Sequence, residues 1–245
     1  MIIAPEITKT RTSGPRIYLD TCAIIEFYKN KKAQEELIDA MSNKKAVLCL
    51  SLLHIYELAK GTDYEGIGEF LNKFNLFCIE FEPGKVIQRE VALKSFENCR
   101  DTEFCCLLKQ YNHNLPKLLT DSHSDPRIIE IADRMSGIIF PFRNNEKQRD
   151  NAKKYFKEEI PNESITQTIL NKIPCDLIRN KNKIISENEC RDIFHIIVPV
   201  VYCDYVILDK YWANILNQLK LSNVARIAEI YKVSEKLKLA EALMK

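Results

Sequence analysis

The sequence predicts an α/β fold, with three α/β/α layers around a central parallel sheet of about five strands and with an all-α insertion. Two observations support this prediction. Short apolar segments are each followed by a longer segment in which apolar residues recur with helical spacing, and this pair occurs three times in the first part of the chain. The alternation returns near the carboxyl terminus, after an interval broken by prolines. Repeated strand-helix pairs are typical of a parallel sheet covered by helices on both faces.

The first two pairs follow a polar leader, residues 1–15. RIYLD (16–20) is expected to form a short buried strand, and the helical spacing after it predicts a helix over 21–41. KAVLCLS (45–51) is the second expected strand. Its last residue is a serine, a preferred helix N-cap, so we expect a helix to follow directly and to end at Gly61.

The other regular elements lie on either side of the insertion. LFCIEFEPG (76–84) is the third expected strand, and a helix is expected to begin near Pro83. Residues 186–203 are expected to form a buried helix, because Ser186 and Glu189 have capping-box spacing before an apolar run. The two remaining expected strands, each followed by a helix, are DYVIL (204–208) and VARIAEIY (224–231).

The interval from about residue 100 to about residue 185 does not follow the alternation. Its amphipathic pieces are separated by prolines, which predicts an all-α insertion in a domain that otherwise spans 16–245. We expect it to cap the active-site edge, and its contact with substrate, a partner protein or a second copy of the chain in a homodimer remains open. Clusters of basic residues are usually solvated surface, but they can also contact phosphate. The candidate substrate-binding residues are Arg143, Arg149, Arg179 and Lys181.

Composition limits the classes of function. A chain of 245 residues that is 46% hydrophobic can bury a substantial core. Its 36 basic and 34 acidic residues give a net charge of only +2, so any site for a polyanion must be local. The nine cysteines include no C-x-x-C pair, which indicates reduced thiols in a cytoplasmic protein. We expect no membrane insertion, because signal-peptide features and uncharged stretches of about 18 apolar residues are both missing from the sequence.

Four acids fall where the expected topology brings distant segments together. Asp20 and Asp209 end the first and fourth expected strands, Glu57 lies on the helix after the second, and Asp192 lies early in the helix before the fourth. Because ligands of parallel sheets bind outside the carboxyl ends of the strands, we expect these carboxylates at one edge. Such a cluster requires a cation, and an all-oxygen ligand set favours Mg²⁺ or Mn²⁺. The bound ion could activate water for attack on phosphorus.

Two aspartates bracket the fourth expected strand, and the sequence favours one of them for this cluster. Asp204 precedes the strand, so we expect it at the amino end, roughly 16 Å from the edge where Asp20 lies. Asp209 follows the strand, beside the start of a helix whose N–H groups and dipole favour a carboxylate. We therefore expect Asp209 to be the fourth acid.

In their order and placement, IYLDT (17–21), SLLHIYELAKG (51–61) and RDIFHIIVPVVYCDYVILDKYW (191–212) resemble the motifs of the PIN-domain ribonucleases. The resemblance covers roughly residues 16–100 and 186–235. It implies a PIN-like fold and a Mg²⁺- or Mn²⁺-dependent endoribonuclease, a hydrolase of phosphodiester bonds in single-stranded or structured RNA. Many such enzymes are the toxin of a toxin-antitoxin pair, so the resemblance also implies an antitoxin protein as partner. The catalytic and metal-binding residues it implies are Asp20, Glu57, Asp192 and Asp209, with Thr21 supporting the metal site.

Residues near the acids qualify this resemblance. Ile207 stands two residues before the last acid, where the family usually has threonine or serine. The segment after Glu57 is much longer than in compact family members, so substrate choice does not carry over. His54 and His195 lie on apolar helices beside the acids and are expected to be packed core residues.

Three of the acids also fit structural roles, and two other classes of protein share part of this pattern. Asp20 and Asp209 are also placed to cap helices, and Asp192 is placed to interact with a helix dipole. A haloacid-dehalogenase-like phosphatase also begins with an aspartate that ends its first strand, but Cys22 occupies the place of its second acid. The main alternative is a PIN-like module that binds RNA or protein without catalysis, and the presence of all four acids argues against it.

Overall fold

The structure, a computed structural model, describes residues 13–80, 82–94, 104–106, 115–123, 164–179, 187–218 and 227–244. These residues contain a six-stranded sheet in the order β4-β3-β2-β1-β5-β6. Five neighbouring strands are parallel, and β4 pairs antiparallel with β3 at the edge. The predicted α/β fold is therefore confirmed. The strands are β1 (Arg16–Leu19), β2 (Val47–Leu50), β3 (Leu76–Ile79), β4 (Phe104–Cys106), β5 (Tyr205–Leu208) and β6 (Glu229–Lys232).

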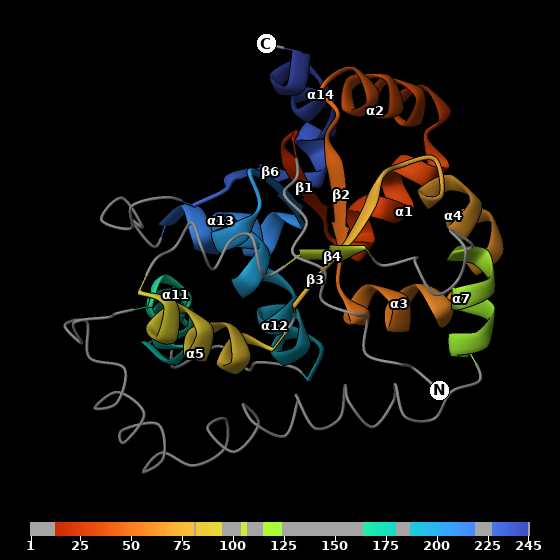
Figure 1. The fold of residues 1–245 in the computed structure, drawn as a ribbon. Coiled ribbons are helices and arrows are strands. Elements are labelled where there is room, and N and C mark those ends of the chain that lie inside the picture. Colours follow the sequence, from red (N-terminus) through yellow and green to blue (C-terminus); the bar gives the residue numbers. More distant parts are fainter. Residues whose placement is uncertain are drawn as a thin grey trace.

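Helices cover both faces of the sheet and give the expected three layers (Figure 1). One layer comprises α1 (Thr21–Lys29), α2 (Lys31–Asn43), α3 (Leu52–Ala59), α4 (Tyr64–Leu71), α7 (Leu115–His123) and α14 (Lys236–Met244). The other comprises α5 (Pro83–Leu93), α11 (Ile165–Arg179), α12 (Glu187–Tyr202) and α13 (Lys210–Gln218). A short 3-10 helix, η3 (Val233–Glu235), joins β6 to α14. None of these described helices is long and apolar enough to cross a membrane.

The central strands separate two hydrophobic cores. In β1, Ile17 and Leu19 pack with the α1 layer, whereas Tyr18 packs with the α12 layer. All three side chains are fully buried. Because strands of a parallel sheet are covered on both faces, they are apolar throughout rather than alternately polar, as VLCL of β2 also shows.

Several boundaries differ from the sequence prediction. The helix expected over 21–41 is two helices, because Asn30 ends α1 and its side chain accepts a hydrogen bond from the N–H of Ala33, 3.1 Å away, to cap α2. The third strand ends at Ile79 because Pro83 already begins α5. Helix α4 was not expected. The last strand, expected over 224–231, covers 229–232 in the described residues, and 224–226 lie outside the description.

The expectation that residues 100–185 are entirely helical is wrong, because β4 lies there and extends the sheet beside β3. The two described helices of this interval pack on the main domain, α7 against α3 and α4, and α11 against α5 and α12. Glu90 of α5 is buried at the second contact. Its carboxylate accepts the N–H of Thr166, 3.1 Å away, and the hydroxyls of Ser164, Thr166 and Tyr202. A buried carboxylate with this many donors fixes α11 to α5 and α12 within the same layer.

Candidate active site

Two of the four predicted acids emerge side by side where β1 and β5 end. Asp20 directly follows β1, and its N–H donates to the carbonyl of Ile207 in β5 at 2.9 Å. Asp209 directly follows β5, so both carboxylates lie at the carboxyl edge of the sheet. Asp204 lies at the amino end of β5, as predicted, where it accepts the N–H of Arg16 at 2.8 Å. The structure therefore separates the two aspartates that bracket β5.

Asp20 and Asp209 each use one oxygen to cap a helix. Oδ1 of Asp20 accepts the N–H of Thr21 at 2.9 Å. Oδ1 of Asp209 accepts the N–H groups of the second and third residues of α13 at 2.6 and 2.9 Å. The thiol of Cys22 donates to Oδ2 of Asp20 at 3.1 Å, and Oδ2 of Asp209 accepts no hydrogen bond from the described residues. Capping thus orients both carboxylates and leaves their second oxygens directed away from the caps, so capping is compatible with a role in the site.

Glu57 reaches this edge from α3 and is held by two side chains. Its Oε2 accepts the hydroxyl of Thr21 at 2.5 Å, and its Oε1 lies 3.4 Å from Nε2 of His195 on α12. Burial raises the pKa of Glu57, but His195 and Thr21 together outweigh burial and lower the pKa to about 2. Glu57 is therefore a fixed, ionised carboxylate, and Thr21 contacts the acid cluster directly.

Asp192 comes from α12 and is linked to Asp209 through one tryptophan. The indole N–H of Trp212 donates to Oδ2 of Asp192 at 3.1 Å, while the backbone N–H of the same residue donates to Asp209. Burial raises the pKa of Asp192, the Trp212 bond lowers it, and repulsion from Asp20 and Glu57 raises it further, to about 7. The cluster therefore carries more negative charge than its surroundings balance.

Electrostatic interactions connect Asp20, Glu57 and Asp192 with one another, and connect Asp209 with Cys22. Burial raises the pKa of Asp20, His195 lowers it, and the negative charge of Glu57 raises it. Burial and the negative charges of Asp20 and Asp209 raise the pKa of the Cys22 thiol. Asp192 is in turn repelled by Asp20 and Glu57. The carboxylates therefore affect one another or share Cys22 as a neighbour. The structure thus brings the predicted quartet together at one edge.

His195 is the positive partner of these acids. It was expected to be a packed core residue, and it is buried, but its ring also faces the cluster. Burial lowers the pKa of His195, yet Glu57, Asp20 and Asp192 raise it by more. On the other side of the ring, Nδ1 lies 2.9 Å from the hydroxyl of Tyr18. His195 therefore contributes positive charge to the site from inside the core.

His54 is a structural residue, as the sequence predicts. Its Nδ1 accepts the N–H of Ser51 at 3.0 Å, so the proton sits on Nε2, which donates to the carbonyl of Leu19 at 2.8 Å. Burial and the nearby His195 lower the pKa of His54 to about 3. This neutral imidazole ties the turn between β2 and α3 to the end of β1, and so helps to place Glu57.

Three residues of the site were not identified from the sequence. Trp212 had a usable signal, since it stands three residues after Asp209, where a capping aspartate meets the helix. Tyr18 carries a polar hydroxyl in an otherwise apolar strand. Cys22 stands where a haloacid-dehalogenase-like phosphatase has its second acid, and that position gave no sign of its contact with Asp20. Ile207, at the position where threonine or serine was expected, is fully buried in the sheet.

The predicted substrate-binding cations cannot be placed near this edge. Arg143, Arg149 and Lys181 lie outside the described residues, as does Ser186 of the expected capping box. Arg179 is the last residue of α11, but its side chain also lies outside the description. These four cations stay predictions.

The donor set fits Mg²⁺ or Mn²⁺ in its chemistry, because four carboxylates supply hard oxygen ligands, and burial together with repulsion from Asp20 and Glu57 raises the pKa of Asp192. As they stand, no three His, Cys, Asp or Glu side chains in the described part of the chain are grouped so as to hold an ion. Metal binding would therefore require the carboxylates to draw together. The oxygens of Asp20 and Asp209 that do not cap helices are the ones placed to turn inward.

Comparisons with models of protein families, with curated proteins and with solved structures found no match to this chain. The function proposed below is therefore supported by the geometry of the site and by the order of its acids along the chain. Neither depends on a relative of known activity.

Proposed function

We propose that the chain is a Mg²⁺- or Mn²⁺-dependent endoribonuclease with a PIN-like site. One observation carries the proposal: Asp20, Glu57, Asp192 and Asp209 come from four separate elements at the carboxyl edge of one parallel sheet, where the first three interact electrostatically and Asp209 acts with Asp20 on the Cys22 thiol. That edge is where ligands of parallel sheets bind. Excess negative charge in such a place is stabilised by a divalent cation, and the substrate of such an ion is typically a phosphate ester.

Each side chain has a defined task in this proposal. Asp20 and Asp209 would hold the ion through the oxygens that do not cap helices. Glu57, fixed by Thr21 and His195, provides a third carboxylate in a set orientation. Asp192, whose pKa is raised to about 7 by burial and by its acidic neighbours, would release its proton when the ion binds. The bound ion would supply an activated water and would neutralise charge on the leaving oxygen.

Single-stranded or structured RNA is the proposed substrate. Its phosphates require a group of basic side chains, which the described residues at the acid edge do not supply. We therefore assign that contact to the basic clusters with Arg143, Arg149, Arg179 and Lys181. The toxin role and an antitoxin partner remain part of the proposal, since both come with the resemblance to PIN-domain ribonucleases. Expression of the wild-type chain should then arrest growth of a host cell, and expression of Asp20→Asn should not.

A PIN-like module without catalysis is the second candidate, and one observation favours it. His195 already offsets charge beside Glu57 and Asp20, so the cluster is partly neutralised by the protein itself. In that case the edge would bind RNA or a protein but would not cleave. The raised pKa of Asp192 argues for the enzyme, because the compensation by His195 is incomplete.

Cleavage of labelled single-stranded RNA separates the two candidates. The purified protein should cut the RNA in Mn²⁺, lose the activity in EDTA and regain it when Mn²⁺ is restored. Asp20→Asn should be inactive in all three conditions, and it serves as the control for contaminating nuclease. RNA binding without cleavage in Mn²⁺ would support the binding module, and cleavage that persists in EDTA would contradict a metal-dependent enzyme.

A further inference from the structure

One residue joins two of the acids on the β1 side of the proposed metal site. The backbone N–H of Thr21, the first residue of α1, donates to Oδ1 of Asp20 at 2.9 Å. The hydroxyl of Thr21 donates to Oε2 of Glu57, which comes from α3. A single residue in the first turn of a helix thus holds the acid that ends a strand and an acid from a neighbouring helix.

Trp212 has the matching place on the β5 side. It is the third residue of α13, and its backbone N–H donates to Oδ1 of Asp209 at 2.9 Å. Its indole N–H donates to Oδ2 of Asp192, which comes from α12, at 3.1 Å. The four acids are therefore held as two pairs. In each pair one residue binds a strand-end aspartate through its backbone and a helix acid through its side chain.

The bond between Trp212 and Asp192 has a fixed direction and a rigid support. Because an indole has one donor and no acceptor, Oδ2 of Asp192 accepts this bond. The side chain of Trp212 is 1% exposed and packs in the hydrophobic core of the α12 layer. The ring of Tyr211 meets it edge-on, with the ring centroids 5.0 Å apart. Trp212 therefore holds Asp192 in one orientation while its own backbone holds Asp209.

This arrangement leaves one oxygen of each acid for a further ligand. Oδ1 of Asp192 and Oδ2 of Asp209 accept no hydrogen bond from the residues that the structure describes. Asp192 is also repelled by Asp20 and Glu57, and the indole N–H keeps it tied to α13 against that repulsion. One buried side chain thus orients two acids whose remaining oxygens are available to an ion.

We propose that Trp212 is a positioning residue of the metal site, which holds Asp192 and Asp209 as one preformed pair of ligands. This inference rests on the proposed metal-dependent function and adds a residue to it. A carboxylate that is fixed before the ion arrives loses less conformational freedom on binding, so the preformed pair binds an ion more tightly than two independent side chains. If the bond only satisfied a buried donor, its loss would lower stability and leave metal affinity unchanged.

The bond can be removed while the shape of the core is kept. Trp212 is the only tryptophan of the chain, so replacing tryptophan by its benzothiophene analogue, in which sulfur stands in place of the indole N–H, alters this position alone. The Mn²⁺ affinity of the full-length protein, measured by electron paramagnetic resonance, should fall roughly three- to tenfold. Trp212→Phe removes the same donor and should lose at least as much. If Trp212→Phe does not fold, the analogue still decides, because it keeps the ring.

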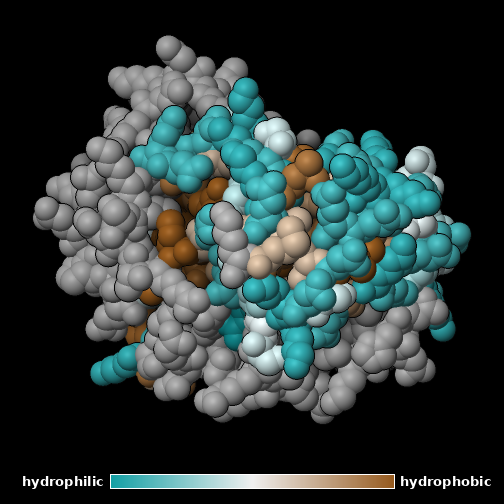
Figure 2. Space-filling model, turned by 90° about the horizontal axis from the view of Figure 1, so that it is seen from above, coloured by the Kyte–Doolittle hydropathy of each residue, from teal (hydrophilic) through white to brown (hydrophobic). Residues whose placement is uncertain are grey.

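Tyr202→Phe is the matched control, because it removes an aromatic donor from another buried carboxylate. Tyr202 ends α12 and donates its hydroxyl to Glu90. It lies about 15 Å along the helix from Asp192. This is toward the amino ends of the strands, the end of the molecule that Figure 2 shows, where hydrophilic residues predominate among those described. The loss should lower the Tm, as the loss of the Trp212 donor does, but should leave Mn²⁺ affinity within about twofold of the wild type.

The fluorescence of Trp212 gives a second measurement, on the unmodified protein. Because the chain has a single tryptophan, its emission reports this contact alone. Saturating Mg²⁺ should change the emission, since the indole N–H binds an acid that takes part in holding the ion. Unchanged emission at a Mg²⁺ concentration that displaces bound Mn²⁺ would overturn the inference.

The outcomes distinguish this inference from the proposed function on which it rests. A wild-type protein that leaves Mn²⁺ free in solution overturns both. Wild-type binding that the analogue and Trp212→Phe retain in full overturns only the role of Trp212. An equal loss of Mn²⁺ affinity in Tyr202→Phe would also overturn that role, because the effect would then follow stability rather than the position of the acids.

Discussion

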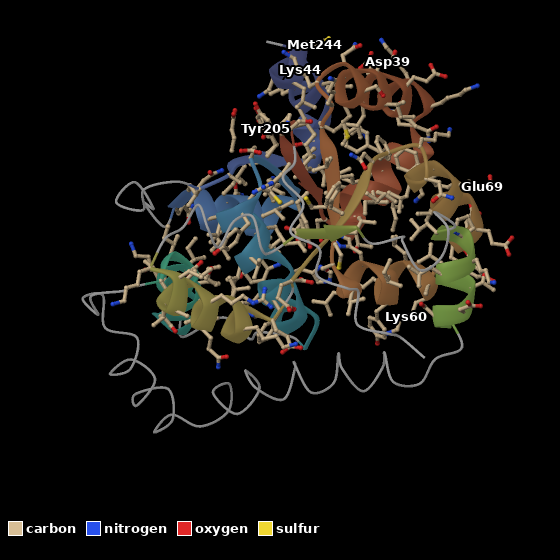
Figure 3. All side chains as sticks on the ribbon, viewed as in Figure 1. Asp39, Lys44, Lys60, Glu69, Tyr205 and Met244 are labelled. Carbon is tan, nitrogen blue, oxygen red and sulfur yellow. The ribbon has the colours of Figure 1, made fainter. Side chains whose placement is uncertain are left out.

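The two ends of the central sheet use similar residues for different purposes. At the carboxyl end, Asp209 caps α13 and joins three other acids whose charges repel one another. At the amino end of the same strand, Asp204 accepts the N–H of Arg16 and fastens β5 to β1. Tyr205 and Lys60, labelled in Figure 3, lie toward these opposite ends. The two aspartates differ in their place on the strand and not in residue type, and only Asp209 lies at the edge of the proposed site.

The same contrast extends to charge. The carboxyl edge has four acids and one internal cation, His195, whereas the described residues that line a hollow between α2 and β2, at the amino end, include Lys45 and Lys73 and no acid. A net charge of +2 for the whole chain conceals this division. Charged side chains of opposite sign are therefore divided between the two ends of one sheet.

The largest expected effect comes from exchanging the two aspartates that bracket β5 for asparagine, one at a time. Asp209→Asn should lower RNA cleavage by at least about tenfold at saturating Mn²⁺, because an amide cannot replace a carboxylate that binds the ion. Asp204→Asn makes the same chemical change and keeps a carbonyl acceptor for Arg16, so cleavage should stay close to the wild-type rate. Rates are compared only for variants whose circular dichroism and Tm show a folded protein. Equal losses in both would mean that position on the strand does not matter.

The next effect concerns the pH dependence of the free energy of unfolding, to which His54 contributes independently of the four acids. The folded pKa of about 3 lies below the unfolded value of about 6.5, so the unfolded chain binds the proton first as the pH falls. The free energy of unfolding that His54 contributes is fully present above pH 6.5. It is lost at up to about 1.4 kcal/mol per pH unit as the pH falls toward 3.

Denaturant unfolding of wild-type and His54→Gln protein between pH 7 and pH 4.5 measures this term. The free-energy difference between the two proteins should shrink as the pH falls, since the variant has no imidazole to protonate. Parallel curves over that range would show that His54 does not hold its neutral form in the folded protein.

The smallest effect is expected for His195→Gln, which keeps a hydrogen-bond donor near Glu57 but removes the positive charge. The cluster becomes more negative by up to one charge, so Mn²⁺ should bind roughly three- to tenfold more tightly. A fall in Mn²⁺ affinity would contradict the interpretation of His195 as a cation that competes with the metal. Tyr18→Phe is the control, because it removes the other hydrogen bond of the ring without removing charge.

Much of this architecture could be predicted because local pattern and topology agree. The apolar runs of β1, β2 and β5 are bounded by an aspartate or serine that caps the next helix, so the carboxyl ends of the strands are visible in the sequence. Once these ends are known, the right-handed, parallel connectivity places Asp20, Glu57 and Asp209 at one edge.

The features that could not be predicted depend on tertiary contacts. The helical spacing of apolar residues continues through Asn30. The break between α1 and α2 becomes evident only from the hydrogen bond by which the Asn30 side chain caps α2 at the N–H of Ala33. Strand β4 has only three residues, and it exists because β3 offers an edge. The pairing of His195 with Glu57 joins residues far apart in sequence. The apolar residues of α12 do not indicate which side chain of another element will face His195.

Direct measurement of Mn²⁺ binding by electron paramagnetic resonance tests the central claim, that the four acids at the carboxyl edge act as one metal-binding unit. Titration of the wild-type protein should show bound Mn²⁺ that Mg²⁺ displaces. Asp20→Asn and Asp192→Asn should each lose most of this binding, while Asp204→Asn at the opposite end of the sheet should retain it. A wild-type protein that leaves Mn²⁺ free in solution, or equal binding by all four proteins, would contradict the claim.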